Sequence, residues 1–435
     1  MKSHRRRSSV AMVLSAVTLT VGLAACSSTE DSARLTWYIN PDGGGSNPEG
    51  GGQAQIAAQC TEAAGGAYSI EIQLLPNSAS DQRQQLLRRL AGGDSGVDLM
   101  SLDPPFIPEF AQAGYLAPVP EDMVEAFTED RVESAVTASE WDGKLVTVPF
   151  WANTQLLWYR KSVAEAAGLD LEGGNVTWEQ LVEAADSQDV TIGVQANRYE
   201  GYTVWINALI AGAGGEILVN PGPALEDIEL GLDSDAGREA AAIVRSVADA
   251  RVGGPSMSTS DETVALNLFQ DPDTSGFLVN WPYVWAAFPA NGVEFIDDIG
   301  WAMYPATNDE GDPAPPYGGI SIGVGAFSEH PDLAYEAAEC ITSHEHQLLY
   351  MVGTGNPASR ASVFDEAEVV EQFPMADVIR DSLEVAVPRP QTQYYGDLST
   401  AIQRVWSPPN GVDPDATPAR SAELIMDVLR GEALL

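Results

Sequence analysis

The chain has 435 residues, of which 63 are acidic and 22 are basic, and its formal net charge at pH 7 is −41. A surface this acidic repels polyphosphates, so nucleic acid is excluded as a partner, and a neutral or cationic ligand is favoured over an anionic one. The length predicts two domains.

The first 25 residues have the pattern of a secretory signal peptide. Four basic residues, Lys2 and Arg5 to Arg7, precede an uncharged run at residues 10–25 that is too short to span a membrane. Removal of residues 1–25 leaves a mature net charge of −45, since it takes away four of the 22 basic residues and no acid. We therefore expect a protein that acts outside the cytoplasm.

The run ends in Leu-Ala-Ala-Cys at residues 23–26, a pattern that resembles a bacterial lipoprotein cleavage site. In that interpretation Cys26 is lipidated, residues 26–33 form a polar tether, and acyl chains alone hold the protein at the extracytoplasmic face of the cell membrane. An ordinary small-residue cleavage site is the alternative. Two cysteines then remain, Cys60 and Cys340, and in an oxidising compartment they suggest one disulfide, with two separate buried thiols as the alternative.

Strands and helices alternate along the first part of the mature chain. The pattern predicts strands at 34–39, 68–75 and 97–102 and helices at 53–64 and 80–91, with a Gly-rich loop at 43–52. Such alternation is typical of an α/β sheet whose ligand loops lie at the carboxyl ends of the strands. Asn40 and Asp103 stand at two such ends.

The later sequence repeats this alternation. A helix closed by Gly114 and a strand at 144–149 lead to a second αβ series at 163–280, which includes a helix start at Thr177 and strands at 192–195 and 277–280. A strand at 320–324 and one long helical segment at 332–351 follow.

Motifs for catalysis or metal binding are weak. The mature chain has no HExxH or Walker sequence, and its one G-x-S-x-G match, at residues 319–323, falls on the predicted strand at 320–324 rather than at a nucleophile elbow. His344 and His346 stand two apart, so a helix would point them in different directions. Paired carboxylates can be neither argued for nor excluded in a chain with 63 acids. We expect no enzymatic activity, no cofactor and no metal.

Four stretches place polar side chains at predicted strand ends, and three of them also contain aromatic residues. They lie at residues 101–103, 151–154, 200–205 and 280–285. A sugar presents an apolar face and a fringe of hydroxyl groups, so its site needs aromatic planes and planar polar side chains. The alternative for each stretch is that the aromatic residues fill the core and the polar residue caps a helix.

These stretches also carry a family resemblance. The sequences PFWANTQLLWYR at 149–160, NWPYVW at 280–285, GGISIG at 318–323 and PRPQTQYY at 388–395 resemble those of extracellular solute-binding proteins of ABC sugar importers. Within that family they are most similar to the trehalose-binding lipoproteins of actinobacteria. The Gly-rich loop after Asn40 departs from those relatives.

The resemblance implies an α/β periplasmic-binding-protein fold of type II, like that of maltose-binding protein, with two lobes that close over a sugar by a hinge. Residues 34–150 and 319–350 would form the N-terminal lobe, and residues 151–318 and 351–435 the C-terminal lobe. The hinge would run near Pro149–Asn153 and Gly318–Gly323. In the first crossing, Leu156, Leu157 and Trp158 would pack while Asn153 faces the sugar.

Nine ligand contacts follow from the resemblance or from position. Those carried over from the family are Asp103, Asn153, Glu262, Trp281, Gly319 and Arg389; Glu200 and Tyr202 match less specifically, and Asn40 rests on its place at a strand end. Arg389 could donate to vicinal hydroxyls or orient Asp103 or Glu262, and a surface arginine is the alternative.

The resemblance further implies a monomeric binding lipoprotein that captures a disaccharide, trehalose in the first instance, and delivers it to the transmembrane subunits of an ABC permease. The membrane would be a partner through the lipid anchor only. A maltose or maltodextrin-binding protein is the alternative in the same class. A secreted glycoside hydrolase is the alternative in another class.

Overall fold

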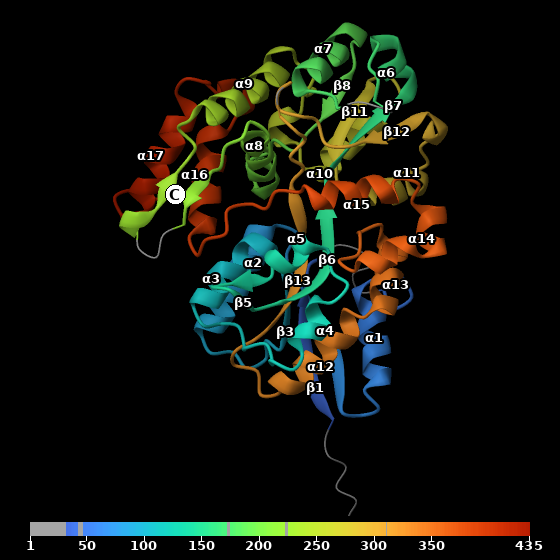
Figure 1. Cartoon of the computed structure of the whole chain (residues 1–435), viewed down its shortest axis with the longest axis vertical. Coiled ribbons are helices and arrows are strands. Elements are labelled where there is room, and N and C mark those ends of the chain that lie inside the picture. The colour runs from blue at the N-terminus through green and yellow to red at the C-terminus, as the bar shows by residue number, and fades with distance from the viewer. Residues whose placement is uncertain (1–31, 42–46, 172–174, 222–224, 310) are drawn as a thin grey trace, which may run out of the picture. The chain divides into compact units, whose positions relative to one another are not determined.

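A computed structural model describes residues 32–41, 47–171, 175–221, 225–309 and 311–435 (Figure 1). The predicted leader, Cys26 and the glycines at 43–45 lie outside these ranges. Residues 33–435 form one compact unit. None of the helices in the described ranges is both long and apolar enough to cross a membrane.

The described strands are β1 (Ala33–Ile39), β2 (Tyr68–Leu74), β3 (Leu99–Leu102), β4 (Glu140–Trp141), β5 (Lys144–Leu145), β6 (Val148–Thr154), β7 (Leu156–Arg160), β8 (Thr191–Gly193), β9 (Leu218–Asn220), β10 (Glu229–Leu230), β11 (Ser275–Asn280), β12 (Ile299–Ala302) and β13 (Tyr317–Val324). The described α-helices are α1 (Gln53–Ala63), α2 (Ala79–Ala91), α3 (Ile107–Gln112), α4 (Val124–Thr128), α5 (Glu133–Thr137), α6 (Lys161–Ala167), α7 (Trp178–Gln188), α8 (Glu200–Gly212), α9 (Asp235–Asp249), α10 (Glu262–Gln270), α11 (Tyr283–Ala290), α12 (Pro331–Ile341), α13 (His344–Thr354), α14 (Ala367–Gln372), α15 (Ala376–Glu384), α16 (Tyr395–Trp406) and α17 (Thr417–Leu429).

The first large sheet has five strands in the order β2-β1-β3-β13-β6. The strands β1, β2 and β3 are parallel, and β13 runs antiparallel between β3 and β6. Leu35, Trp37 and Ile39 of β1 are fully buried, as expected for a strand covered by helices. The predicted strands at 34–39 and 68–75 and the helices at 53–64 and 80–91 are confirmed by β1, β2, α1 and α2.

The second large sheet has four strands in the order β12-β7-β11-β8. Every residue of β11 is buried, so helices and loops cover both of its faces. Thr177 begins α7 with a capping box, in which its side chain accepts from the Gln180 N–H and the Gln180 side chain accepts from the Thr177 N–H. In Figure 1, α16 and α17 lie beside α8 and α9 of this lobe.

The first crossing between the sheets comes later than the sequence predicted, and the return crossing comes earlier. The strand β6 stays in the first sheet through Thr154 and β7 opens in the second sheet at Leu156, so the crossing lies at Gln155 rather than at the expected boundary after residue 150. All of β13, from Tyr317 onward, belongs to the first sheet. Leu156, Leu157 and Trp158 are fully buried.

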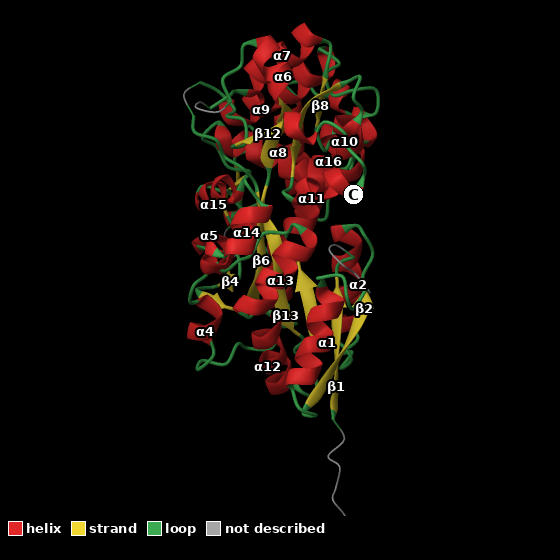
Figure 2. Cartoon of the chain, turned by 90° about the vertical axis from the view of Figure 1, so that its right-hand side faces the viewer, coloured by secondary structure: helices red, strands yellow, loops and turns green. Residues whose placement is uncertain are grey.

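The predicted single helix at 332–351 is wrong, because the structure has two helices there. The first, α12, ends at Ile341, and α13 begins at His344. Ser343 starts the second helix by accepting a hydrogen bond from the His346 N–H with its side chain. Both helices lie with α1 beside the first sheet (Figure 2).

A disulfide joins Cys60 of α1 to Cys340 of α12 across 280 positions of sequence. His346 is buried beside it, with Nδ1 2.7 Å from the main-chain oxygen of Cys340 and Nε2 3.0 Å from Oε1 of Gln59. Because both sulfurs are used in the disulfide, this group of two cysteines and a histidine offers no thiolate to a metal ion.

Candidate functional site

Four of the predicted contact residues lie at one edge of the five-stranded sheet. Asn40 and Asp103 directly follow the parallel strands β1 and β3, and Asn153 is near the end of β6. Gly319 lies near the start of β13, whose antiparallel direction brings its first residues to the same edge. In that register Gly318 is directly opposite Asn153.

Two other predicted residues lie at the carboxyl edge of the four-stranded sheet. Trp281 follows β11, and Glu262 begins α10. Asn280 links them, since its Nδ2 donates to the main-chain oxygen of Glu262 at 3.0 Å and its Oδ1 accepts from the Trp281 N–H at 2.9 Å. Tyr199 lies beside Glu262, and burial followed by the Glu262 carboxylate raises the pKa of Tyr199 well above its ordinary value.

The indole ring of Trp281 connects the two sheets. A Cβ atom added to Gly318 would lie 2.9 Å from Cη2 and Cζ3 of this ring, and 3.7 Å from Cβ of Asn153. The ring therefore lies against the backbone of Gly318, beside Asn153. Trp281 is only half-buried, unlike the core tryptophans Trp158 and Trp178. Part of its surface remains available to a ligand.

Arg389 ties the two lobes together in the segment between α15 and α16. Its Nη2 donates to Oδ1 of Asp103 at 2.5 Å, and its Nη1 donates to Oδ2 of Asp103 at 3.0 Å and to Oε1 of Glu200 at 2.7 Å. Burial alone would lower the pKa of Arg389, but the neighbouring charges, that of Asp103 foremost and that of Glu200 among the others, raise it well above its ordinary value. With 4% of its surface exposed, Arg389 is not a surface arginine.

Glu200 is held by three donors. Besides Arg389, the Tyr395 hydroxyl donates to Oε1, and the Ser399 hydroxyl donates to Oε2 at 2.7 Å. Burial and then the Glu200 charge raise the pKa of Tyr395 well above its ordinary value. Both carboxylate oxygens of Glu200 are thus used inside the protein, so the structure gives it the role of fixing Arg389.

The Trp281 group consists of Trp281, Gly318, Asn153 and Glu262, and the Arg389 group consists of Arg389, Asp103 and Glu200. The two groups adjoin at two places. Tyr317 directly precedes Gly318, and burial followed by the Asp103 charge raises the pKa of Tyr317, so Asp103 lies near it. Tyr199, beside Glu262, directly precedes Glu200. Together the groups form one interlobe cluster of an aromatic plane, amides, carboxylates and a guanidinium. These groups can stack on a sugar ring and exchange hydrogen bonds with its hydroxyls.

Some buried polar atoms near the cluster lack hydrogen-bond partners among the described residues. Two of them are Nε of Arg389, and Oε1 of Gln53, whose Nε2 donates to Oδ1 of Asn40 at 2.9 Å. A buried polar group without a partner is costly, so each such atom at a site favours a ligand that can bond to it.

The structure does not place Tyr202 in the cluster. Its side chain is fully buried, and its hydroxyl donates to the main-chain oxygen of Trp406 at 3.0 Å. Two residues apart on a helix, side chains point about 200° apart, so Glu200 faces the other lobe while Tyr202 points into the core of its own. We therefore remove Tyr202 from the candidate contacts.

Sequence reasoning missed several residues of the cluster. Tyr395 and Ser399 donate hydrogen bonds to Glu200, and Gln53 donates to Asn40. At the crossing between the sheets, Nε2 of Gln155 donates to Oε1 of Gln195 at 2.9 Å. Tyr395 stands in the PRPQTQYY stretch that carried the family resemblance, which was the one available signal for it.

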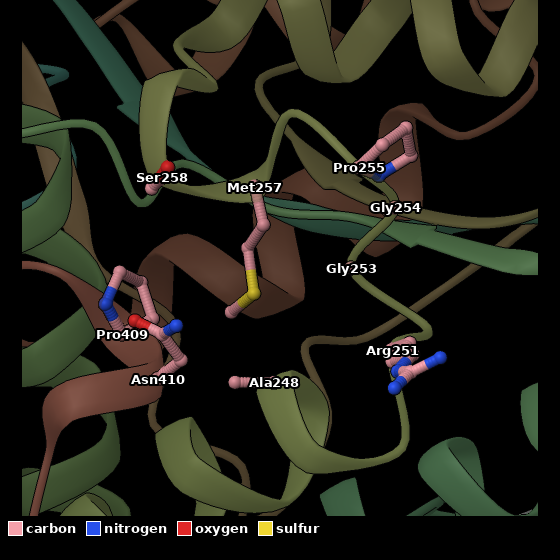
Figure 3. A pocket seen from close by; sticks show the side chains of 9 residues that line it. All are labelled: Ala248, Arg251, Gly253, Gly254, Pro255, Met257, Ser258, Pro409 and Asn410. Atoms are coloured by element: carbon pink, nitrogen blue, oxygen red, sulfur yellow. The ribbon is translucent and has the colours of Figure 1, made fainter.

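A cavity of about 390 Å³ lies elsewhere, in the C-terminal lobe (Figure 3). The Met257 side chain projects into it towards Ala248 and Asn410. None of the predicted contact residues is among those that line it. Because the cavity is not next to the interlobe cluster, it has no part in the site built above.

Comparison with known proteins gives a family and a fold. Residues 51–348 match the family described as bacterial extracellular solute-binding protein, which is more than half of the chain. A probable ABC transporter-binding protein of Deinococcus radiodurans is 25% identical over 345 residues, which cover 74% of this chain and 77% of the relative.

Two solved structures share the arrangement of lobes. A maltose-bound T. maritima protein, MalE3, superimposes with a TM-score of 0.77 at 22% identity and covers 92% of this chain and 100% of its own. UgpB of Mycobacterium tuberculosis, in complex with glycerophosphocholine, gives a TM-score of 0.75 at 19% identity and covers 93% of this chain and 100% of its own. The two-lobed α/β fold implied by the sequence is therefore confirmed.

Proposed function

Because the chain belongs to the family of bacterial extracellular solute-binding proteins, we propose that it is the binding lipoprotein of an ABC importer, and that it captures a disaccharide between its lobes and delivers it to a membrane permease. Trehalose is the sugar that we propose first. The proposal includes no chemical conversion of the ligand.

One observation carries the proposal. The half-buried Trp281 ring lies against Gly318 beside Asn153, at the junction of the two sheets, and Asp103, which bonds to Arg389, lies near Tyr317, the residue before Gly318. An aromatic plane beside amide, carboxylate and guanidinium groups suits a sugar ring with its hydroxyl fringe. Contributions from both lobes suit a ligand that favours lobe closure.

Calorimetry against a sugar panel tests the proposal. The panel contains trehalose, maltose, maltotriose, sucrose and glucose. We expect one-to-one binding, tightest for trehalose, together with a rise in melting temperature at saturating sugar. If none of the sugars binds or raises the melting temperature, the proposal is refuted.

Maltose or a maltodextrin is the second candidate ligand, and the fold shared with maltose-bound MalE3 supports testing it. Tighter binding of maltotriose than of trehalose in the same panel would favour it. A glycoside hydrolase is the competing class, and incubation of the protein with each disaccharide, followed by chromatography of the products, tests it. We expect the disaccharides to be recovered intact.

Anchoring is part of the proposal as well. Cys26 is proposed as the lipidated N-terminus, which would tether a monomer at the extracytoplasmic face of the membrane. Mass spectrometry of the detergent-extracted protein is expected to find a chain that begins at Cys26 and carries acyl groups. Cys26→Ala is expected to leave uncleaved precursor without acyl groups. A wild-type N-terminus at any other residue would contradict the proposal.

A further inference from the structure

Basic residues are scarce in this chain, and the interlobe cluster contains one of them, Arg389. All 18 basic residues that follow residue 25 lie within the described ranges. Among the described residues, Arg389 is the arginine that bonds to predicted contact residues, through Asp103 and Glu200. Arg83, the arginine above Phe106 near the same lobe junction, is already paired with Glu109.

The guanidinium of Arg389 is shared between two carboxylates. Both of its Nη atoms donate to Asp103 or Glu200, so these three side chains together carry a formal charge of −1. Glu262 brings a third carboxylate to the same cluster, beside Tyr199. An anionic group on a ligand would therefore lie close to carboxylates, while the guanidinium of Arg389 is already bonded to Asp103 and Glu200.

Building on the proposed function, we infer that the interlobe site selects its ligand by charge: it accepts a hydroxylated ligand that is neutral or carries an ammonium group, and it rejects the phosphorylated or carboxylated counterpart. A neutral hydroxyl can accept from the unpartnered Nε–H of Arg389. An ammonium group can donate to the carboxylates, whereas a phosphate brings like charge into a poorly solvated space.

Four related disaccharides test this inference by calorimetry on the mature wild-type protein. They are trehalose, 6-amino-6-deoxytrehalose, trehalose 6-phosphate and 6-acetamido-6-deoxytrehalose, the last being a neutral control for the size of the phosphate. The amine is expected to bind within about threefold of trehalose or more tightly, and the phosphate about 100-fold more weakly or worse. The acetamide is expected to lose much less affinity than the phosphate.

Glu200→Gln provides the matched variant, because it replaces one of the two carboxylates that bond to Arg389 with a neutral amide. The loss of affinity for trehalose 6-phosphate, relative to trehalose, is expected to be smaller in this variant by about tenfold or more. Arg198→Gln is the control, since Arg198 is exposed and close in sequence but outside the cluster, and the loss is expected to stay unchanged. Melting curves establish that both variants fold.

The outcomes separate the inference from the function on which it rests. Binding of the phosphate within threefold of trehalose, or equal losses for the phosphate and the acetamide, would overturn selection by charge while leaving sugar binding intact. If Glu200→Gln does not fold, the four wild-type affinities still decide. Failure of all four ligands to bind would refute trehalose as the ligand, and the sugar panel described above would then decide the proposed function.

Discussion

Trp281 is the residue whose role is most directly testable. Trp281→Ala removes a half-buried aromatic face from the interlobe cluster, and a desolvated aromatic contact of this kind commonly contributes about 2 kcal/mol or more, so affinity for the sugar is expected to fall about thirtyfold or further. The fold is expected to be retained. Sugar calorimetry and a melting curve on the same sample measure both quantities.

Trp178→Ala is the matched control for that variant. Trp178 is fully buried against Trp205, so its loss is expected to lower the free energy of unfolding by about 3–5 kcal/mol and to leave affinity in the folded fraction nearly normal. If Trp281→Ala behaves like this control, its ring is core and not a sugar platform.

Asn153 tests the amide side of the cluster. Its Oδ1 accepts from the N–H of Thr154 at 3.0 Å, and 5% of the residue is exposed, so truncation removes polar contacts rather than a large apolar surface. Asn153→Ala is expected to weaken sugar binding by about 1–3 kcal/mol, because hydroxyls of the bound sugar lose their partners. Unchanged affinity, measured by calorimetry, would remove Asn153 from the proposed contacts.

These residues differ in how well the sequence alone predicts their positions. The family resemblance placed Asp103, Asn153 and Trp281 near a ligand, and their positions at strand ends, which share an edge, agree with it. The partners of Glu200 could not be placed, since Tyr395 is 195 positions away and only the folded chain brings the two together. Tyr202 was misplaced because its aromatic character is equally suited to a core.

At the scale of elements, a carboxylate joins α6 and β12. Asp298, before β12, accepts from Nε of Arg160 at 2.6 Å and from the N–H and hydroxyl of Ser162 at 2.8 Å and 2.6 Å. Burial raises the pKa of Asp298, but these hydrogen bonds outweigh it and lower the pKa below its ordinary value of 3.8. A carboxylate with a lowered folded pKa stabilises the fold above the ordinary value, and that contribution is lost as the pH falls through the folded pKa.

Asp298→Asn is therefore expected to lower the free energy of unfolding at pH 7 by about 1 kcal/mol, a value reduced for partial exposure. The difference from the wild type is expected to shrink steadily below pH 3.8. Urea unfolding at several pH values measures it. Asp235→Asn is the control, since that exposed carboxylate pairs with Arg238 on the surface, and little change is expected at any of these pH values. A pH-independent loss for Asp298→Asn would contradict the argument.

Elements with strong local patterns were predictable, and breaks between them were not. The strand β1 and the helix α1 were placed closely because apolar spacing decides both. At the break between α12 and α13 the Ser343 side chain accepts a hydrogen bond from the His346 N–H, a local signal that an apolar pattern running through residues 332–351 conceals.

At the scale of the molecule, the disulfide closes a loop of 280 positions. The Cys60→Ser, Cys340→Ser double variant is expected to lose up to about 5 kcal/mol of unfolding free energy, since a long loop restricts the unfolded chain strongly. Urea unfolding of the variant, and of the wild type with reductant, is expected to give the same lowered value. Thiol titration of unfolded, unreduced mature protein is expected to find neither cysteine reactive, and two reactive thiols would refute the bridge.

Lobe closure is the remaining expectation for the whole molecule. The chain crosses between the sheets at Gln155 and again before Tyr317, and a few such connections can act as a hinge. Small-angle scattering is expected to show a smaller radius of gyration with saturating trehalose than without it. Glucose at the same concentration serves as the weakly binding control. Identical profiles with and without trehalose would argue against closure.

The place of β13 in the first sheet also decides the order in which the lobes can be completed during synthesis. The ribosome makes β3 and β6 well before β13, which must lie between them, so both strands keep an unpaired edge until Tyr317–Val324 has emerged. By then all four strands of the second sheet, from Leu156 to Ala302, are already available. The lobe that begins the chain is therefore the last to have its sheet completed.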